Sequence, residues 1–297
     1  MLEKLSCCTI CPHMCKVNRL NNNIGRCKCN NSIKIALASL HQFEEPCISG
    51  KNGSGTVFFS NCNLNCVYCQ NHLISQQGKG KIISIEHLAK IFINQQKKGA
   101  SNINLVTPTM YVYQIIEAIK IAKEAGLNIP IIYNTNGYEN VETIKLLNGY
   151  VDVFLPDFKY SDNKLAKKYS NVDNYFEIAS KAILEMYFQV GHPQFDASGL
   201  IKKGIIIRHL ILPNHIDNTK NVLLWIKDNL PKGVYISLMA QYFPTYKAKE
   251  MPSLNRKLTS SEYDEVLEIL SNLDINGYFQ ELGEHEEEYV PNFDLSE

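Results

Sequence analysis

The sequence lacks the features that mark a protein for a nucleic-acid or membrane-bound partner. Its 30 Lys and Arg residues equal its 30 Asp and Glu residues, so the formal net charge is zero. It has no local run of Lys and Arg, which gives no support for nucleic-acid binding. No apolar stretch approaches the roughly 20 residues of a membrane span. The N-terminal residues contain no apolar secretory core. We therefore expect a soluble, cytoplasmic protein that binds neither nucleic acid nor membranes.

Cysteine is absent from residues 70–297, although the chain contains ten. In a reducing compartment, clustered cysteines are more often metal ligands or redox groups than disulfides. One group lies between residues 62 and 69, and Cys47 stands alone. The N-terminal group comprises Cys7, Cys8, Cys11, Cys15, Cys27 and Cys29.

From about residue 55 the chain alternates short apolar runs with amphipathic stretches. The runs that we predict as strands are 56–60, 103–106, 131–134, 151–156, 205–212, 234–239 and 277–281. Helical spacing of apolar residues is found in 84–99, 110–126, 217–229 and 260–273. Such alternation predicts an α/β fold with a mainly parallel sheet, and it fits a whole or partial barrel better than two domains.

Three regions follow from this pattern. Residues 1–50 are polar and rich in cysteine, and we expect a small metal- or loop-based N-terminal extension there. Residues 51–280 form the predicted barrel. Residues 281–297 are acidic and contain no Lys or Arg, which indicates a solvated tail.

The stretch CNLNCVYC places Cys62, Cys66 and Cys69 directly after the first predicted strand. A structural zinc ion uses four protein ligands, and a cubane iron–sulfur cluster normally takes four thiolates. Three thiolates would leave one iron open to a substrate or cofactor. The alternative is a thioredoxin-like C-x-x-C at Cys66 and Cys69, with Cys62 incidental. The position of the motif after a strand favours the cluster.

Polar residues follow the predicted strands one after another. In a β/α barrel, functional groups gather in the loops after the C-terminal ends of the strands. After the cysteines come Thr107 to Thr109, Asn134 to Asn136, Asp157 and Lys159, Arg208 and His209, and Gln241 and Tyr242. We expect such a ring to surround a bound cofactor, although each member alone is also compatible with an ordinary turn or cap.

Two of these pairs have predictable directions. Asp157 and Lys159 have the i, i+2 spacing that points both side chains to one face of a strand. Arg208 and His209 are neighbours, so only one of them faces the barrel interior. We expect Arg208 to face inward and meet a cofactor carboxylate, and His209 to lie behind the sheet.

The N-terminal cysteines suggest a second metal site. Cys8, Cys11 and Cys15 follow C-x2-C-x3-C spacing, with Cys27 further along. Four thiolates in such spacing suit zinc or a second iron–sulfur cluster, and the sequence does not decide between them. Cys7 or Cys29 could take the place of Cys8 or Cys27.

With Tyr68 before the last cysteine, CNLNCVYC resembles the signature of radical S-adenosylmethionine (radical SAM) enzymes. Together with VTPT, NTNG, PDFK, IRHLILP and MAQY, it makes nearly the whole chain similar to relatives of pyruvate formate-lyase-activating enzyme. The resemblance implies a partial (β/α)6 TIM-type barrel with a cysteine-rich N-terminal extension. It also implies a [4Fe-4S] cluster on Cys62, Cys66 and Cys69 that binds S-adenosyl-L-methionine through its open iron.

The resemblance implies an oxygen-sensitive oxidoreductase. Reductive cleavage of S-adenosyl-L-methionine would give a 5′-deoxyadenosyl radical, which abstracts hydrogen from a substrate that the sequence does not identify. A glycyl radical enzyme is one candidate, as for an activating enzyme, and a small molecule is another. A flavodoxin or ferredoxin would supply the electron. The competing hypothesis is an iron–sulfur or zinc binding module that acts in electron transfer or assembly without cleaving this cofactor.

The residues that we predict to contact the cofactor are Tyr68, Thr107, Thr109, Asn134, Asn136, Asp157, Lys159, Arg208, Gln241 and Tyr242. Asp157 and Lys159 match the D-x-K of activating enzymes. Two positions depart from their pattern. Thr107 to Thr109 occupy the place of the usual G-G-E-P, which binds the methionine amine, and Asn134 stands where activating enzymes have Asp. Binding of the amine must therefore differ in detail.

Overall fold

A single sheet contains the strands of the part of the chain described by the computed structural model, which covers residues 1–273, 275–283, 291 and 293. The strand order is β10-β9-β8-β6-β5-β4-β2-β1-β3, and the short β7 pairs with β8. The bounds are β1 (Ile33–His41), β2 (Ser54–Phe59), β3 (Lys81–Ile83), β4 (Ile103–Val106), β5 (Ile131–Thr135), β6 (Val153–Pro156), β7 (Gln194–Phe195), β8 (Ile201–Leu210), β9 (Tyr235–Met239) and β10 (Asn276–Phe279).

Six of these strands form the parallel series of a partial barrel. The strands β2, β4, β5, β6, β8 and β9 pair in that order, each parallel to the next, and β10 is parallel to β9. Since all their carboxyl ends lie at one edge of the sheet, the loops that follow them share one end of the molecule. The predicted α/β class and partial barrel are confirmed. The strand predicted at 103–106 coincides with β4, and the others differ from the observed strands by one to four residues at their ends.

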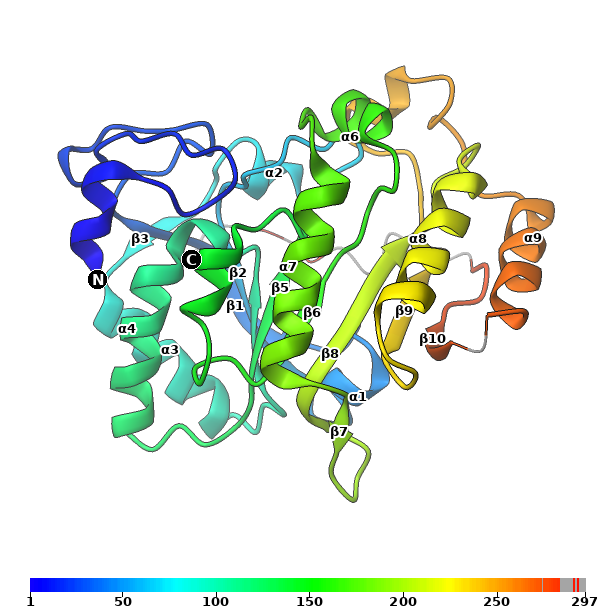
Figure 1. The fold of residues 1–297 in the computed structure, drawn as a ribbon. Helices are drawn as coiled ribbons and strands as arrows, with labels where there is room; N and C mark the ends of the chain where they lie inside the picture. Colours follow the sequence, from blue (N-terminus) through cyan, green and yellow to red (C-terminus); the bar gives the residue numbers. More distant parts are fainter. Residues whose placement is uncertain (274, 284–290, 292, 294–297) are drawn as a thin grey trace.

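The longer helices lie on the outer side of this curved sheet, whereas the short α1 lies at its lower end (Figure 1). Their bounds are α1 (Pro46–Ser49), α2 (His72–Ser75), α3 (Ile85–Lys97), α4 (Val112–Glu124), α5 (Val141–Lys145), α6 (Asn163–Ser170), α7 (Tyr175–Val190), α8 (Ile216–Asn229) and α9 (Ser260–Ser271). Short 3₁₀ turns span η1 (Leu2–Cys7), η2 (Arg19–Asn21), η3 (Thr109–Tyr111) and η4 (Tyr246–Glu250). Among the described residues, no helix is long and apolar enough to cross a membrane.

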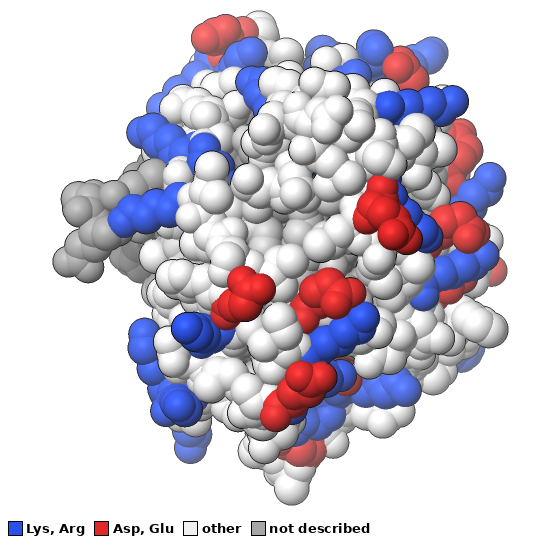
Figure 2. Space-filling view, turned by 90° about the vertical axis from the view of Figure 1, so that its left-hand side faces the viewer, with Lys and Arg blue, Asp and Glu red and all other residues white. Residues whose placement is uncertain are grey.

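Helix α3 illustrates how the sequence sets these elements. The Ser84 side chain accepts a hydrogen bond from the backbone N–H of His87, which caps the first turn. Leu88, Ala89 and Phe92 are buried at helical spacing, so one stripe of the helix packs on the sheet. Figure 2 shows charged side chains of both signs along the margins of one face and below its centre, whereas its upper middle is largely uncharged.

Strand β1 was not predicted, because residues 1–50 showed little periodicity, and β3 was not predicted because it is only three residues long. β1 runs antiparallel to β2, with Ala38 opposite Val57, and β3 pairs with the start of β1. The chain then passes through residues 42–50, here called the floor segment, before β2 begins. Its short helix α1 buries Cys47 and Ile48 against a group of barrel side chains. That group comprises Ile132, Val153, Leu155, Ile201 and Ile206.

The N-terminal residues pack on the barrel beside α4 and α5. Thr143 donates a 2.6 Å hydrogen bond to the carbonyl of Ile10, and Asn140 donates to the carbonyl of Thr9. Leu5, Ile10 and Tyr113 belong to a small separate apolar cluster there. The predicted acidic tail falls largely outside the described residues.

Candidate active site

The loop after β2, residues 60–71, is here called the cysteine loop, and contacts from several elements fix its course. Asn63 donates a 2.7 Å hydrogen bond to the carbonyl of Tyr138, in the loop after β5. The His13 ring lies 2.7 Å from the carbonyl oxygen of Asn63. On the other side, the N–H of Val67 donates to the carbonyl of Tyr169 at the end of α6. The loop is therefore held by the N-terminal extension and by the loops of later strands.

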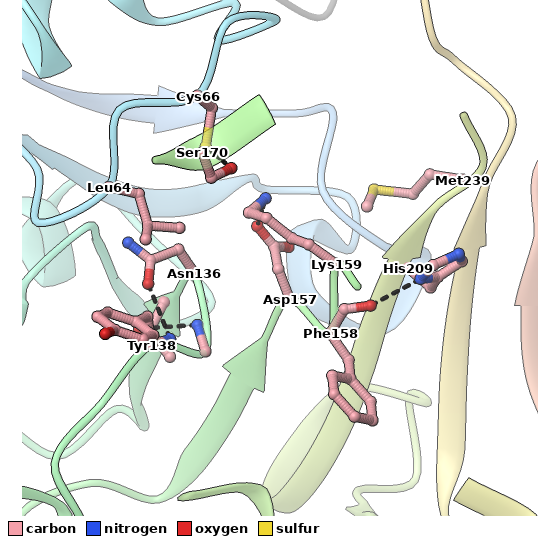
Figure 3. A network of polar contacts seen from close by, with 12 residues as sticks. Leu64, Cys66, Asn136, Tyr138, Asp157, Phe158, Lys159, Ser170, His209 and Met239 are labelled. Carbon is pink, nitrogen blue, oxygen red and sulfur yellow. Dashed lines mark hydrogen bonds and ion pairs between the residues drawn. The ribbon is translucent and has the colours of Figure 1, made fainter. Parts of the chain in front are cut away.

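Cys62, Cys66 and Cys69 all line one cavity of about 460 Å³ at the carboxyl ends of the strands. Each sulfur also has a polar neighbour. Asn136 donates to the Cys62 sulfur at 3.3 Å, the Ser170 hydroxyl lies 3.0 Å from the Cys66 sulfur, and the Ser75 hydroxyl lies 3.1 Å from that of Cys69. Figure 3 shows the Cys66–Ser170 pair above the strand ends.

The three thiols are electrostatically coupled. Burial raises the pKa of Cys62, Cys66 and Cys69, that of Cys69 to about 11, and the charge on Cys66 raises those of Cys62 and Cys69 further. Thiolates gathered without a cation are therefore unfavourable, and a bound metal would remove the penalty by taking the place of the protons. The cysteines of the described residues are free of disulfides.

The donor set fits an iron–sulfur cluster better than a single ion. Among the described residues, no three His, Cys, Asp or Glu side chains converge closely enough to hold one metal ion. A cubane cluster binds each thiolate through a different iron, so its ligands need not converge on one point. Cys62, Cys66 and Cys69 open into one cavity, which matches three cluster corners.

A hydrogen-bonded chain connects Cys66 with Tyr68 through two further hydroxyls. Ser170 lies 2.7 Å from the hydroxyl of Tyr160, which in turn lies 2.5 Å from the hydroxyl of Tyr68. All four residues are buried, and Tyr68 lines the cavity. The chain fixes the ring of Tyr68 beside the cysteines, and it satisfies hydroxyls that would otherwise be costly to bury.

Most of the predicted strand-end residues line the same cavity. They are Tyr68, Thr107, Asn134, Asn136, Asp157, Lys159, Arg208 and Gln241. Thr107 has a positive φ of 59°, an uncommon conformation for a β-branched residue. In Figure 3, Asp157 and Lys159 lie together below Cys66, with Asn136 and Met239 on either side.

Asp157 and Lys159 form a partly buried ion pair, as the i, i+2 spacing predicted. The ammonium Nζ of Lys159 lies 2.6 Å from Oδ2 of Asp157. Burial opposes the charge of Lys159, but the charges of Asp157 and Cys66 outweigh it and raise the pKa of the ammonium. The lysine therefore stays protonated, and it places a positive charge close to the cysteine loop.

Two predicted contacts lie outside the cavity. Thr109 is fully buried and donates a 2.6 Å hydrogen bond to Glu139, because the 3₁₀ turn after β4 directs its side chain behind the loop. Tyr242 is also buried, and its hydroxyl donates to the carbonyl of Leu254. Its ring touches that of Tyr68 at 6.2 Å between centroids, so it supports the cavity wall from behind.

Arg208 faces the cavity, but its charge is already matched. Its Nε donates to Glu45 at 2.7 Å, and its Nη2 donates to both Glu44 and Glu45. Both carboxylates come from the floor segment, which sequence reasoning did not connect with the site. The prediction that Arg208 meets a cofactor carboxylate is therefore weakened, because two protein carboxylates already hold the guanidinium. His209 lies behind the sheet, as predicted, between the carbonyl of Phe158 and the hydroxyl of Thr219.

Glu139 is a buried carboxyl that the sequence analysis did not single out. Thr109, Thr135 and Tyr133 all donate to its Oε1, whereas its Oε2 has no hydrogen-bond partner among the described residues. Burial raises its pKa to about 7, against the effect of the three donors. It lies beneath the contact between the N-terminal extension and the barrel, since its charge also acts on Cys11.

The N-terminal cysteines have different surroundings. The guanidinium of Arg19 is 1% exposed and donates to the carbonyls of Asn30 and Met110, with the Cys8 sulfur 4.0 Å away. The described residues provide no carboxylate for it. Cys29 accepts from Asn61 at 3.3 Å and lies 3.4 Å from the Tyr111 hydroxyl. The predicted metal site on Cys8, Cys11, Cys15 and Cys27 is not formed as a single-ion site, and it stays a prediction.

Fold and site together define a β/α-barrel protein with a thiol-lined cavity at the carboxyl ends of its strands. The family model described as the radical SAM superfamily matches residues 56–201. The uncharacterized protein MJ0674 of Methanocaldococcus jannaschii is 37% identical over 281 residues, which are 90% of this chain and 76% of that protein. The chain belongs to the radical SAM superfamily.

Other relatives are more distant. Protein MJ0808 of the same organism, also named as uncharacterized, is 29% identical over 202 residues, which are 64% of this chain and 53% of that protein. A radical SAM methyltransferase from Sphaerobacter thermophilus has a TM-score of 0.53 at 15% identity. The match covers 76% of this chain and 66% of the methyltransferase chain. The hydrogenase maturase HydG from Carboxydothermus hydrogenoformans has a TM-score of 0.50 at 13% identity. The match covers 77% of this chain and 54% of the HydG chain. These two structures show that the fold is shared.

Proposed function

We propose that this protein is a radical SAM enzyme that cleaves S-adenosyl-L-methionine reductively and uses the product to abstract hydrogen from its substrate. Membership of the superfamily supports radical chemistry dependent on this cofactor. The observation that carries the proposal is the shared cavity. Three thiols from the loop after β2 open into the space that the residues after β4, β5 and β6 surround.

The residues of this cavity have separable roles in the proposal. Cys62, Cys66 and Cys69 would hold a [4Fe-4S] cluster, which together with the nucleoside cofactor supplies the 5′-deoxyadenosyl radical when both are bound. The Lys159 ammonium would attract the carboxylate of the cofactor. The backbone and side-chain oxygens at Thr107 and Asn134 would accept hydrogen bonds from its amine in place of a glutamate.

The lower half of the cavity is left for a substrate. Arg208, Glu44 and Glu45 line the same cavity as the Asp157–Lys159 pair and are satisfied by one another. Because the floor segment fills the barrel beneath them, the substrate has to enter from the open side or from the cysteine-loop end. An activating role on a glycyl radical protein and an electron donor of the flavodoxin or ferredoxin type are further parts of this proposal.

The test is direct. Protein reconstituted with iron and sulfide without air, then given dithionite and S-adenosyl-L-methionine, should produce 5′-deoxyadenosine and methionine. Both products are measured by liquid chromatography. An intact cluster that produces neither would contradict the proposal and favour a module for electron transfer or assembly.

We also propose that the N-terminal cysteines hold a second metal centre. The buried Arg19 supports this, since an isolated cation in the interior is costly. A thiolate–metal centre beside it would provide the missing negative charge. The metal content of protein that lacks Cys62, Cys66 and Cys69 tests this, because any iron or zinc bound near stoichiometry must then lie elsewhere.

A further inference from the structure

The outer surface of the cysteine loop is bordered by three segments that are far apart in sequence. The His13 ring contacts the carbonyl of Asn63, the N–H of Asn65 donates to the carbonyl of Ser170, and Ala248 donates to the carbonyl of Val67. The segments are residues 13–28, 163–172 and 244–249. In Figure 1 the N-terminal extension and α6 lie at the same end of the molecule as α2, which follows the cysteine loop.

These three segments contain nine Lys and Arg residues and no Asp or Glu. Arg19 is buried, and the others are exposed. The exposed residues, here called the basic collar, are Lys16, Arg26, Lys28, Lys164, Lys167, Lys168, Lys247 and Lys249. Three acids flank the segments at Asp162, Asp173 and Glu250, and Asp173 pairs with Lys167 at 2.9 Å. The surplus of positive charge is local, because the whole chain is neutral.

The collar segments contact the part of the cysteine loop on either side of Cys66, at Asn65 and Val67. Asn65 is exposed, although it stands between Cys62 and the buried Cys66. The collar segments contact the loop through the His13 ring and backbone hydrogen bonds, so their backbone keeps a fixed position beside it. Arg26 also donates to the carbonyl of Asn171, which joins two of the three segments.

We propose that the basic collar is the docking surface for a small acidic one-electron carrier protein. This inference rests on the proposed function, which needs an external electron. One electron leaves the reduced carrier and enters the cluster beneath Asn65, and no bond is formed or broken. Opposite charge on the partner raises the association rate and orients the encounter. A ring of charge around a single loop suits such a compact partner better than the continuous stripe that tracks a nucleic-acid backbone.

Direct binding tests the collar. The probe is an oxidised flavodoxin of strongly negative net charge, titrated calorimetrically into anaerobically reconstituted protein at low salt. The collar variant combines Lys164→Glu, Lys168→Glu, Lys247→Glu and Lys249→Glu. The control combines Lys97→Glu, Lys98→Glu, Lys220→Glu and Lys227→Glu, which changes the net charge by the same amount at the C-terminal end of α3 and on α8. We expect the collar variant to bind roughly tenfold more weakly or worse and the control less than threefold, with wild-type binding weakened by salt.

Several results would overturn the proposal. Equal losses in the two variants would show a response to net charge alone. Unchanged binding in the collar variant would place the partner elsewhere. A single-stranded RNA of matched charge that binds the collar more tightly than flavodoxin would make the surface a nucleic-acid site. Thermal unfolding of both variants checks that the substitutions leave the fold intact.

A second measurement separates this proposal from the function on which it depends. With dithionite as reductant, the collar variant should form 5′-deoxyadenosine at the wild-type rate, because dithionite needs no docking surface. With reduced flavodoxin, its rate should fall in proportion to the loss of binding. If wild-type protein forms no product with either reductant, the proposed function fails, whereas the calorimetric result still decides whether the collar binds an acidic carrier.

Discussion

Two groups of cysteines in this chain have opposite electrostatic surroundings. In the cysteine loop, three thiols share a cavity and the nearest cation is Lys159, which is already paired with Asp157. In the N-terminal extension, the thiol of Cys8 lies beside the guanidinium of Arg19, which has no carboxylate partner among the described residues. The cation beside the first group is already matched by a carboxylate, whereas the cation beside Cys8 has no carboxylate partner in the part of the chain that the structure describes.

This difference shows that cysteine spacing alone does not define a metal site. The loop after β2 presents its thiols to a space that other strand ends complete. The N-terminal cysteines range from exposed Cys7 through partly buried Cys15 and Cys27 to buried Cys8, Cys11 and Cys29. Cys29 is 2% exposed beneath the Tyr111 hydroxyl, and Cys11 is 8% exposed. The difference therefore lies in the cavity and not in burial alone, because the residues that line it include Cys62, Cys66 and Cys69 and none of the N-terminal cysteines.

The largest expected effect contrasts one cysteine from each group. Cys66→Ser should lower 5′-deoxyadenosine formation by at least about 10³-fold, because a lost ligand removes an element on which the whole reaction depends. Cys15→Ser should leave a measurable rate. Liquid chromatography of the reaction measures both, and circular dichroism checks the fold. Equal loss in the two variants would mean that both groups of cysteines are needed for catalysis.

Next comes Arg19→Met, which removes the buried cation of the N-terminal group. If thiolates balance this charge, the loss should destabilise the protein by about 3–5 kcal/mol and release the associated metal, as for a broken buried ion pair. Urea unfolding and elemental analysis provide the two readouts. A small change in stability with unchanged metal content would show that no thiolate centre depends on Arg19.

A smaller effect, which depends on pH, is expected for the contribution of Glu139 to the stability of the fold. Burial raises its pKa from 4.5 to about 7, so the folded chain binds more protons than the unfolded chain between these values. Its contribution to the free energy of unfolding therefore falls as pH rises from about 4.5 to about 7 and is constant above that.

The pKa difference corresponds to a change on the order of 3 kcal/mol. Between pH 4.5 and pH 8, the stability of Glu139→Gln relative to wild type should improve by that amount, since the amide cannot ionise. Urea unfolding at several pH values measures it. Parallel pH profiles for the two proteins would mean that Glu139 does not titrate in this range.

The smallest effect concerns the attachment of the N-terminal extension. Thr143→Val removes the 2.6 Å hydrogen bond to the carbonyl of Ile10 while keeping the shape of the side chain. We expect a loss of about 1 kcal/mol. Hydrogen exchange should show faster exchange in residues 8–17 and unchanged protection in β5. Faster exchange throughout the barrel would mean that the extension and barrel unfold as one unit.

Sequence reasoning predicted the barrel because its strands are short apolar runs between helices with clear caps and stripes. It missed β1, whose residues are only partly buried and pair antiparallel with β2 outside the alternation. It also missed the role of Glu44 and Glu45, because an ion pair across more than 160 positions leaves no local signal.

The sequence predicted those site residues that stand directly at the carboxyl ends of the parallel strands. Cys62, Asn136 and Lys159 reach the cavity because parallel strands end at one edge of the sheet. Thr109 and Tyr242 did not follow this rule, because the turns that contain them rotate the side chains into the interior. Such rotations depend on φ and ψ within a loop, which residue type alone does not determine.

The floor segment has one further consequence. It precedes the first barrel strand, yet it supplies Glu44, Glu45 and the helix that closes the barrel from below. The depth of the cavity and the reactive groups that line it are thus determined by separate stretches of the chain. Substitutions within residues 42–50 would change the depth or the charge of the cavity at the end where the floor segment lies. The cysteines and the strand-end residues would stay the same. New substrate specificities can therefore arise here, by evolution or engineering, without changes to the residues proposed to bind the cluster and the cofactor.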